Sequence, residues 1–89
     1  MGTLTNLEGV KANEIEAVFI NKPSDIRAIL RQGKGATTAK SNGAINIWRD
    51  DAGMIRCNAM RWLQSVDHQT YRTLKEAELW VRKWLKEIE

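Results

Sequence analysis

Cysteine, histidine and proline are almost missing from this chain. Its 89 residues include one of each, Cys57, His68 and Pro23. A lone cysteine cannot close an internal disulfide, which small secreted domains usually need, so we expect a protein of the cytoplasm. One cysteine and one histidine also fall short of the paired ligands of a zinc site. We therefore expect no metal, no cofactor and no enzyme activity, and we interpret His68 as a surface residue in a turn.

Long apolar runs are also missing. No stretch approaches the roughly 20 apolar residues of a membrane-spanning helix, and the N-terminus lacks a cationic stretch before an apolar one, so we expect no membrane association. The composition, 43% hydrophobic and 28% charged, is typical of a globular domain, and a chain of 89 residues builds one core. The net charge of +3 matters for binding only where cations cluster. We expect a loose arm over residues 1–13 and a single domain over residues 14–89.

Two short elements are predicted in the first half of the domain. Residues 14–20 have the alternation and the Val, Phe and Ile content of a strand, although Asn13 could instead cap a short helix. A helix is predicted near residues 24–32, because Ser24 suits a helix start and Gly33 suits a left-handed helix end.

The segment that follows, residues 33–43, is small, polar or basic throughout and predicts a mobile loop. Its Gly33-Lys34-Gly35 is similar to a phosphate-binding loop, but the required spacing and the following helix are missing. Lys34 and Lys40 could still contact a nucleic-acid backbone from this loop, since such contacts need donors and flexibility more than fixed geometry.

The best-defined feature is a hairpin around the sequence Asp51-Ala52-Gly53. With Gly53 in the left-handed position of a three-residue loop, Trp48 faces Arg56 across the two strands. This register sorts the side chains by chemistry. One face carries Ile45, Ile47, Ile55, Cys57 and Ala59. The other face carries Asn46, Trp48, Arg56, Asn58, Met60 and Trp62.

The C-terminal part predicts a short strand and a long helix. Residues 64–69 are interpreted as a turn or irregular connection, with a third short strand at residues 70–72. Thr73 and Glu76 fit a capping box, and an apolar stripe follows at helical spacing. Together these elements predict an α+β fold, in which a small antiparallel sheet of three or four strands packs against a C-terminal amphipathic helix.

Two surfaces are candidates for binding. The outer face of the hairpin combines planar contact area, a cation and amide groups, unless a second layer from the N-terminal strand or the short helix covers it. A ridge on the C-terminal helix sets Lys75, Arg82 and Lys86 around an exposed Leu79, unless it is only a solvated face. Cys57 points inward in this register and is expected to be unreactive.

The stretch from Ala44 to Gly53, followed by residues 70–80, resembles the arm-binding N-terminal domain of phage-type tyrosine recombinases. That family has a three-stranded antiparallel sheet backed by a C-terminal helix. The resemblance covers residues 44–89. It implies a sheet inserted into a DNA groove through Asn46, Trp48, Arg56 and Asn58.

Two functions are consistent with these patterns. The first is a non-enzymatic nucleic-acid-binding module, for DNA in preference to RNA, that would use the outer hairpin face together with phosphate contacts from Lys34, Lys40, Lys75, Arg82 and Lys86. The second is a protein-binding inhibitor or adaptor, such as a phage-encoded blocker of a host defence nuclease complex. Its hot spot would be the patch of Trp48, Met60 and Trp62.

Overall fold

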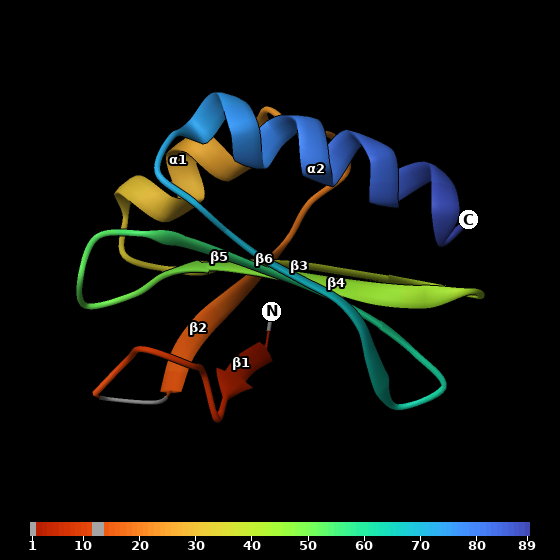
Figure 1. Ribbon diagram of the computed structural model, residues 1–89, viewed down its shortest axis with the longest axis horizontal. Helices are drawn as coiled ribbons and strands as arrows, with labels where there is room; N and C mark the ends of the chain where they lie inside the picture. The colour runs from red at the N-terminus through yellow and green to blue at the C-terminus, as the bar shows by residue number, and fades with distance from the viewer. Residues whose placement is uncertain (1, 12–13) are drawn as a thin grey trace.

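The strands of this chain form one sheet in chain order, and both helices lie on one side of it (Figure 1). The computed structural model describes residues 2–11 and 14–89. The expected α+β class and the C-terminal helix against the sheet are confirmed. The expected antiparallel sheet of three or four strands is wrong, because six strands are present and one neighbouring pair is parallel. The elements are β1 (Gly2–Thr5), β2 (Glu14–Phe19), α1 (Asp25–Arg31), β3 (Gly35–Lys40), β4 (Gly43–Arg49), β5 (Ile55–Arg61), β6 (Gln64–Tyr71) and α2 (Leu74–Glu87).

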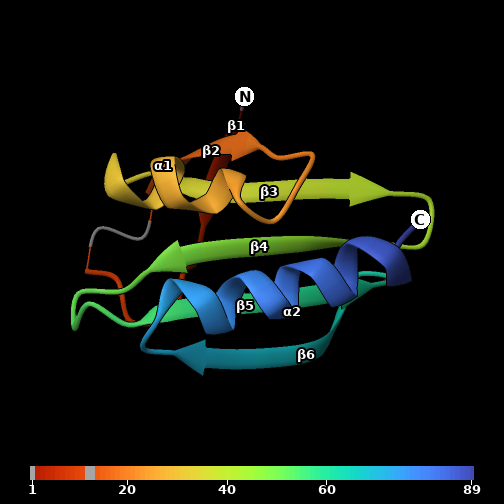
Figure 2. The ribbon, with the colours of Figure 1, turned by 90° about the horizontal axis from the view of Figure 1, so that it is seen from above.

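The strands β2 and β3 are parallel neighbours, and α1 connects them. The predicted mobile loop over residues 33–43 is therefore wrong, because most of it forms β3 in the middle of the sheet. Ala36 is fully buried and Thr38 is 4% exposed. Such small side chains leave room for α1, which lies along β3 (Figure 2). The predicted strand over residues 14–20 is confirmed by β2.

The hairpin of β4 and β5 has the predicted register, with Trp48 opposite Arg56 and Ile45 opposite Ala59. Gly53 has a φ of 85°, as the predicted left-handed position requires. The turn is held by Asp50, whose Oδ1 accepts hydrogen bonds from the backbone N–H groups of Ala52 (3.0 Å) and Met54 (2.9 Å). The inward-facing residues of the hairpin lie in the core beneath the helices, as expected.

The predicted turn over residues 64–69 is wrong, because these residues form most of β6. The strand pairs antiparallel with β5, and a β-bulge falls between Ala59 and Met60. The two strands are joined directly by Trp62 and Leu63, so the connection is a turn of two residues. This sharp reversal leaves no room for the irregular segment that we expected.

Both helices cover the inner face of the sheet, and α2 lies along β5 (Figure 2). Its predicted capping box is confirmed in part. The Thr73 hydroxyl oxygen accepts from the Glu76 backbone N–H (3.3 Å), but the Glu76 carboxylate bonds the Thr73 hydroxyl (2.8 Å) instead of the Thr73 backbone N–H. The predicted helix near residues 24–32 is confirmed by α1. Ser24 occupies its N-cap but makes no side-chain capping bond. In the part of the chain that the structure describes, no helix has the length and apolar character needed to cross a bilayer.

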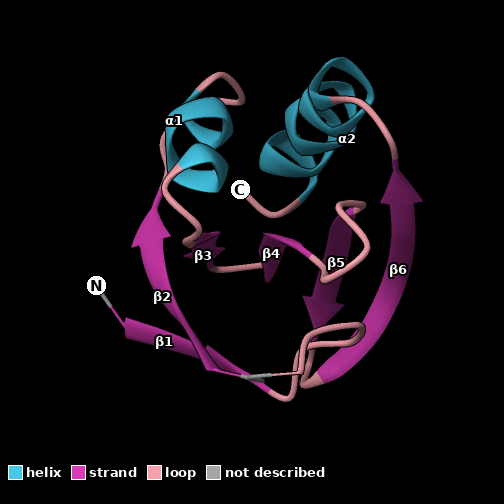
Figure 3. Ribbon diagram, turned by 90° about the vertical axis from the view of Figure 1, so that its left-hand side faces the viewer, coloured by secondary structure: helices cyan, strands magenta, loops and turns pink. Residues whose placement is uncertain are grey.

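The sheet curls so that β1 and residues 6–11 lie on the side away from both helices (Figure 3). The segment expected as a loose arm over residues 1–13 contains β1, which pairs antiparallel with β2. The chain after β1 then crosses the outer face, where Leu7 is 8% exposed. The alternative of a short helix after Asn13 is wrong, because the residues that follow form β2; Asn13 itself lies outside the described residues. The outer face of the sheet is thus partly covered by the chain's own beginning.

Candidate functional site

The outer face of the hairpin is divided into a covered half and an open half. In the covered half, Trp48 is only 4% exposed, and its indole N–H donates to the backbone oxygen of Glu8 (3.1 Å). The other side of its ring stacks on His68, with ring centroids 6.3 Å apart and planes at 19°. The expectation of an exposed Trp48 is therefore wrong. The alternative of a second layer is confirmed here, although the cover comes from the residues expected as a loose arm.

Arg56 is held within the same covered half. Its Nε donates to the Asp50 carboxylate (2.8 Å), and its Nη1 lies 3.3 Å from the Glu8 carboxylate. Burial would raise the pKa of Asp50, but the hydrogen bond from Arg56 and those from two backbone N–H groups lower it below its ordinary value. The same bond to Asp50 raises the pKa of Arg56. Two carboxylates thus neutralise the cation that we expected to face a partner.

The open half begins with two facing asparagines. Asn46 and Asn58 are cross-strand partners and both are half-buried. The Thr37 hydroxyl donates to Asn46 Oδ1 (2.8 Å), and the Ser65 hydroxyl donates to Asn58 Oδ1. Neither NH₂ group has a hydrogen-bond acceptor within residues 2–11 and 14–89. The open half therefore presents two amide donors to solvent.

The turn between β5 and β6 is the most unusual feature of the surface. Trp62 has a φ of 52° and Leu63 a φ of 64°, so both lie in the left-handed region that glycine and asparagine normally occupy in two-residue hairpin turns. For side chains of this size the conformation costs roughly 1–2 kcal/mol per residue. Trp62 is nonetheless 88% exposed and Leu63 95% exposed. The turn projects from the sheet away from both helices, at the lower right of Figure 1.

A shallow pocket of about 390 Å³ lies beside this turn. Its lining is mostly apolar, with Lys40 as the charged member. We call this set the tip surface, and it consists of Ala39, Lys40, Gly43, Ala44, Met60, Trp62 and Leu63.

The base of the tip surface is firmly held. Arg61 donates to the backbone oxygens of Asn42 (3.1 Å) and Glu87 (2.9 Å), which joins the end of β5 to the β3–β4 turn and to the end of α2. Gly43 has a φ of 145°, and a Cβ at this position would lie 2.5 Å from the Met60 backbone oxygen. Only glycine allows the strands to approach this closely. The two exposed side chains therefore stand on a rigid support.

The structure brings some predicted site residues together and keeps others apart. Lys40, Met60 and Trp62 meet in the tip surface, and Asn46 and Asn58 lie on the same sheet face. Lys34 lies at the start of β3 and pairs with Glu16 (2.8 Å). The ridge residues remain on α2, on the opposite side of the sheet, where Leu79 is 56% exposed as expected. These are Lys75, Leu79, Arg82 and Lys86.

Sequence reasoning missed Leu63 and the turn that exposes it. The usual signal for a two-residue hairpin turn is Asn-Gly or a similar pair, and Trp-Leu gives no such signal. The sequence signal for this turn is the pair of large apolar residues, Trp62 and Leu63, directly before a mostly polar stretch, Gln64–Tyr71. In the structure no residue of that stretch is fully buried.

The remaining reactive groups do not form a site. Cys57 is fully buried, and burial, assisted by the charge of Asp67, raises the pKa of its thiol to about 12. In residues 2–11 and 14–89, no three His, Cys, Asp or Glu side chains converge on a common point. The fold and the site define a small α+β domain with an apolar hairpin tip. No family model, curated protein or solved structure matches the chain.

Proposed function

We propose that this chain is a non-enzymatic protein-binding module, an inhibitor or adaptor, which inserts Trp62 and Leu63 into an apolar pocket of its partner. The observation that carries this proposal is the two-residue turn, where both side chains are almost fully exposed in a left-handed backbone conformation. Strained backbone that no local contact explains is concentrated at functional sites.

The energetics favour a protein as the partner. Burying a leucine side chain contributes about 1.5–3 kcal/mol, and tryptophan is among the residues most enriched at interface hot spots. The exposed turn gains none of this free energy in the isolated chain. Because Arg61 and Gly43 hold the base of the turn, little backbone conformational entropy remains to be lost on binding.

The polar groups beside the tip surface would orient a bound partner. Lys40 belongs to the tip surface, and the facing Asn46 and Asn58 lie two residues along the strands from Ala44 and Met60, on one side of the apolar part. An apolar centre with a polar rim is the usual arrangement of a protein interface. Carbonyl or carboxylate oxygens at the rim of the partner's pocket would satisfy these donors.

The test is affinity capture followed by a binding measurement with the purified captured protein. The double substitution Trp62→Asn with Leu63→Gly removes both apolar side chains and supplies the residues that this turn type prefers. We expect it to weaken binding at least 100-fold while the fold stays intact by circular dichroism. Phe19→Ser is the matched control, because Phe19 is 61% exposed and lies outside the tip surface. Unchanged binding by the double variant would refute the proposal.

Nucleic-acid binding is the second candidate function, and the cations of α2 favour it. Lys75, Arg82 and Lys86 are exposed and form no ion pair within the described ranges of the chain. Binding of this kind weakens steeply as salt rises, because each neutralised phosphate releases counterions. Capture that survives nuclease treatment but is lost in the double turn variant supports a protein partner. Capture that nuclease abolishes supports this second function instead.

A further inference from the structure

The strand β6 forms one edge of the sheet, and no described residue pairs with its outer side. It is eight residues long, Gln64–Tyr71, and it contains neither lysine nor proline, which commonly protect exposed edges. Its bulge lies near its beginning, opposite Ala59 and Met60. Most of the strand therefore presents a regular row of backbone donors and acceptors.

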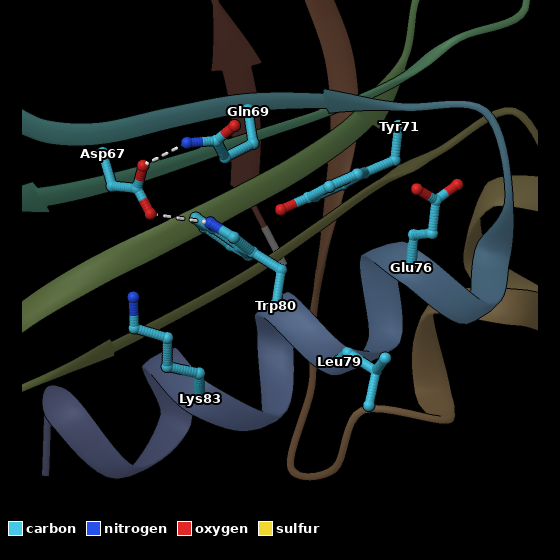
Figure 4. A pocket seen from close by; sticks show the side chains of 7 residues that line it. All are labelled: Asp67, Gln69, Tyr71, Glu76, Leu79, Trp80 and Lys83. Atoms are coloured by element: carbon cyan, nitrogen blue, oxygen red, sulfur yellow. Dashed lines mark hydrogen bonds between the residues drawn. The ribbon is translucent and has the colours of Figure 1, made fainter.

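A cleft of about 380 Å³ runs between this edge and α2 (Figure 4). Asp67 and Lys83 stand at one end of it, and Tyr71 and Glu76 stand at the other (Figure 4). Trp80 lines the middle, and Leu79, which is 56% exposed, lines the α2 side toward Glu76 (Figure 4). The cleft thus has an apolar middle and ends of different charge.

The charged and polar residues of this cleft are complementary to the same residues of a second copy related by a two-fold axis. On α2, Glu76 and Lys83 lie on either side of Trp80, and on β6, Asp67 and Tyr71 lie two residues before and after Gln69, which lies beside Trp80 (Figure 4). In a two-fold contact the same patch is used by both copies, and each residue meets its opposite number. A second copy placed antiparallel would bring its Lys83 to Glu76 and its Asp67 to the hydroxyl of Tyr71.

We propose that a second copy of this chain binds along β6, so that the two β6 strands pair antiparallel and the two clefts cover each other. Backbone hydrogen bonds extend the sheet across the axis, and Leu79 of each copy loses its contact with water. The two Glu76–Lys83 pairs fix the direction and the register of the contact. This self-association does not depend on the proposed function, because the tip surface takes no part in it.

Charge reversal on the intact chain tests this proposal by analytical ultracentrifugation. We expect the wild type to form dimers, and Glu76→Lys or Lys83→Glu alone to weaken the dimer roughly tenfold or more, because each places two like-charged pairs in the contact. An equimolar mixture of the two single variants should dimerise again, since each now complements the other. The variant carrying both reversals should also regain the dimer.

Two further measurements keep a folding defect apart from a lost contact. Circular dichroism of each single variant must show the wild-type helix content, because the Glu76 carboxylate also bonds the hydroxyl of Thr73, the N-cap of α2. Backbone amides of β6 should become protected from hydrogen exchange as the wild-type concentration rises. The substitutions at Trp62 and Leu63 should leave the dimer unchanged, which separates this proposal from the proposed function. A wild type that stays monomeric, or a mixture that fails to dimerise, overturns the proposal.

Discussion

At Trp62 and Leu63 the backbone adopts a conformation that asparagine and glycine take at little cost. The large side chains gain almost no burial in return, since they are 88% and 95% exposed. We therefore expect Trp62→Asn with Leu63→Gly to increase the free energy of unfolding by about 1–2 kcal/mol, because relief of the strain at both residues is partly offset by the greater freedom of glycine in the unfolded chain. Urea denaturation measures this change. A double variant less stable than the wild type would show that the exposed side chains make contacts that stabilise the fold.

Asp67 connects β6 to α2 through two tryptophans. Its Oδ2 accepts from the indole N–H groups of Trp80 and Trp84, each at 2.9 Å, and both rings are buried. Asp67→Ala would leave both N–H groups without this acceptor, and we expect a loss of about 2–4 kcal/mol in the free energy of unfolding. Asp67→Asn keeps an acceptor oxygen and should cost less. Thermal and urea unfolding of the two variants provide the comparison.

The same carboxylate makes the stability depend on pH. Burial would raise the pKa of Asp67, but the bonds from Gln69, Trp84 and Trp80 and the charge of Lys83 lower it below its ordinary value. A lowered pKa in the folded state contributes stability that is present above the unfolded value of about 4 and is lost as pH falls through the folded value. The wild type should therefore lose stability below about pH 4 more steeply than Asp67→Asn does. Equal slopes for the two proteins would contradict this role.

Among the elements, the N-terminal segment across the outer face depends on one glycine. Gly9 has a φ of 80°, and a Cβ there would lie 2.9 Å from the Cβ of Asp50. Gly33 has a φ of 74°, with nothing within 4 Å of the corresponding position. Alanine at either position costs about 1 kcal/mol for the left-handed conformation. Only Gly9→Ala also forces the segment away from the sheet.

We therefore expect Gly9→Ala to destabilise the protein more than Gly33→Ala does. It should also expose Trp48, which the segment covers in the wild type. Tryptophan fluorescence should shift to longer wavelength in Gly9→Ala and stay unchanged in Gly33→Ala. Identical spectra and stabilities for the two variants would mean that the segment is not tightly docked.

How far the elements could be predicted depends on whether their signals are local. The register of the β4–β5 hairpin and the capping of α2 by the Thr73 side chain follow from neighbouring residues, and both were predicted correctly. The strand β3 was missed because its pairing with β2 crosses α1, and its small residues fit the sheet only when α1 packs above them. Only the end of β6 was predicted, as a short strand at residues 70–72, and the rest was missed because its inward side is polar. Asp67 is accommodated on the inward side of β6 because the indole N–H groups of Trp80 and Trp84 donate to its carboxylate.

The candidate site was predictable in part for the same reason. Met60 and Trp62 follow from the hairpin pattern, whereas the exposure of Trp48 depends on a segment some 40 residues earlier in the chain. No pattern within the hairpin reveals that Glu8 accepts from the indole. A long-range contact of this kind needs the three-dimensional structure.

For the molecule as a whole, the single cysteine reports on global unfolding. Cys57 is fully buried in the core between the sheet and the helices. Because burial holds the thiol pKa near 12, the reactive thiolate is almost missing from the folded protein at neutral pH. We expect labelling of the thiol to require global unfolding. Its rate should rise with urea at the slope of the equilibrium unfolding curve. A rate independent of urea would indicate local opening instead.

The order of the strands also has a consequence for how the molecule assembles. From β3 to β6 each strand pairs with the next along the chain, whereas β2 reaches the sheet only through the parallel crossover. Contacts between sequence neighbours form with less loss of chain entropy than distant ones. We infer that the meander from β3 to β6 forms first during folding. In this order of events, the strained turn at Trp62 and Leu63 forms before the N-terminal segment packs over Trp48.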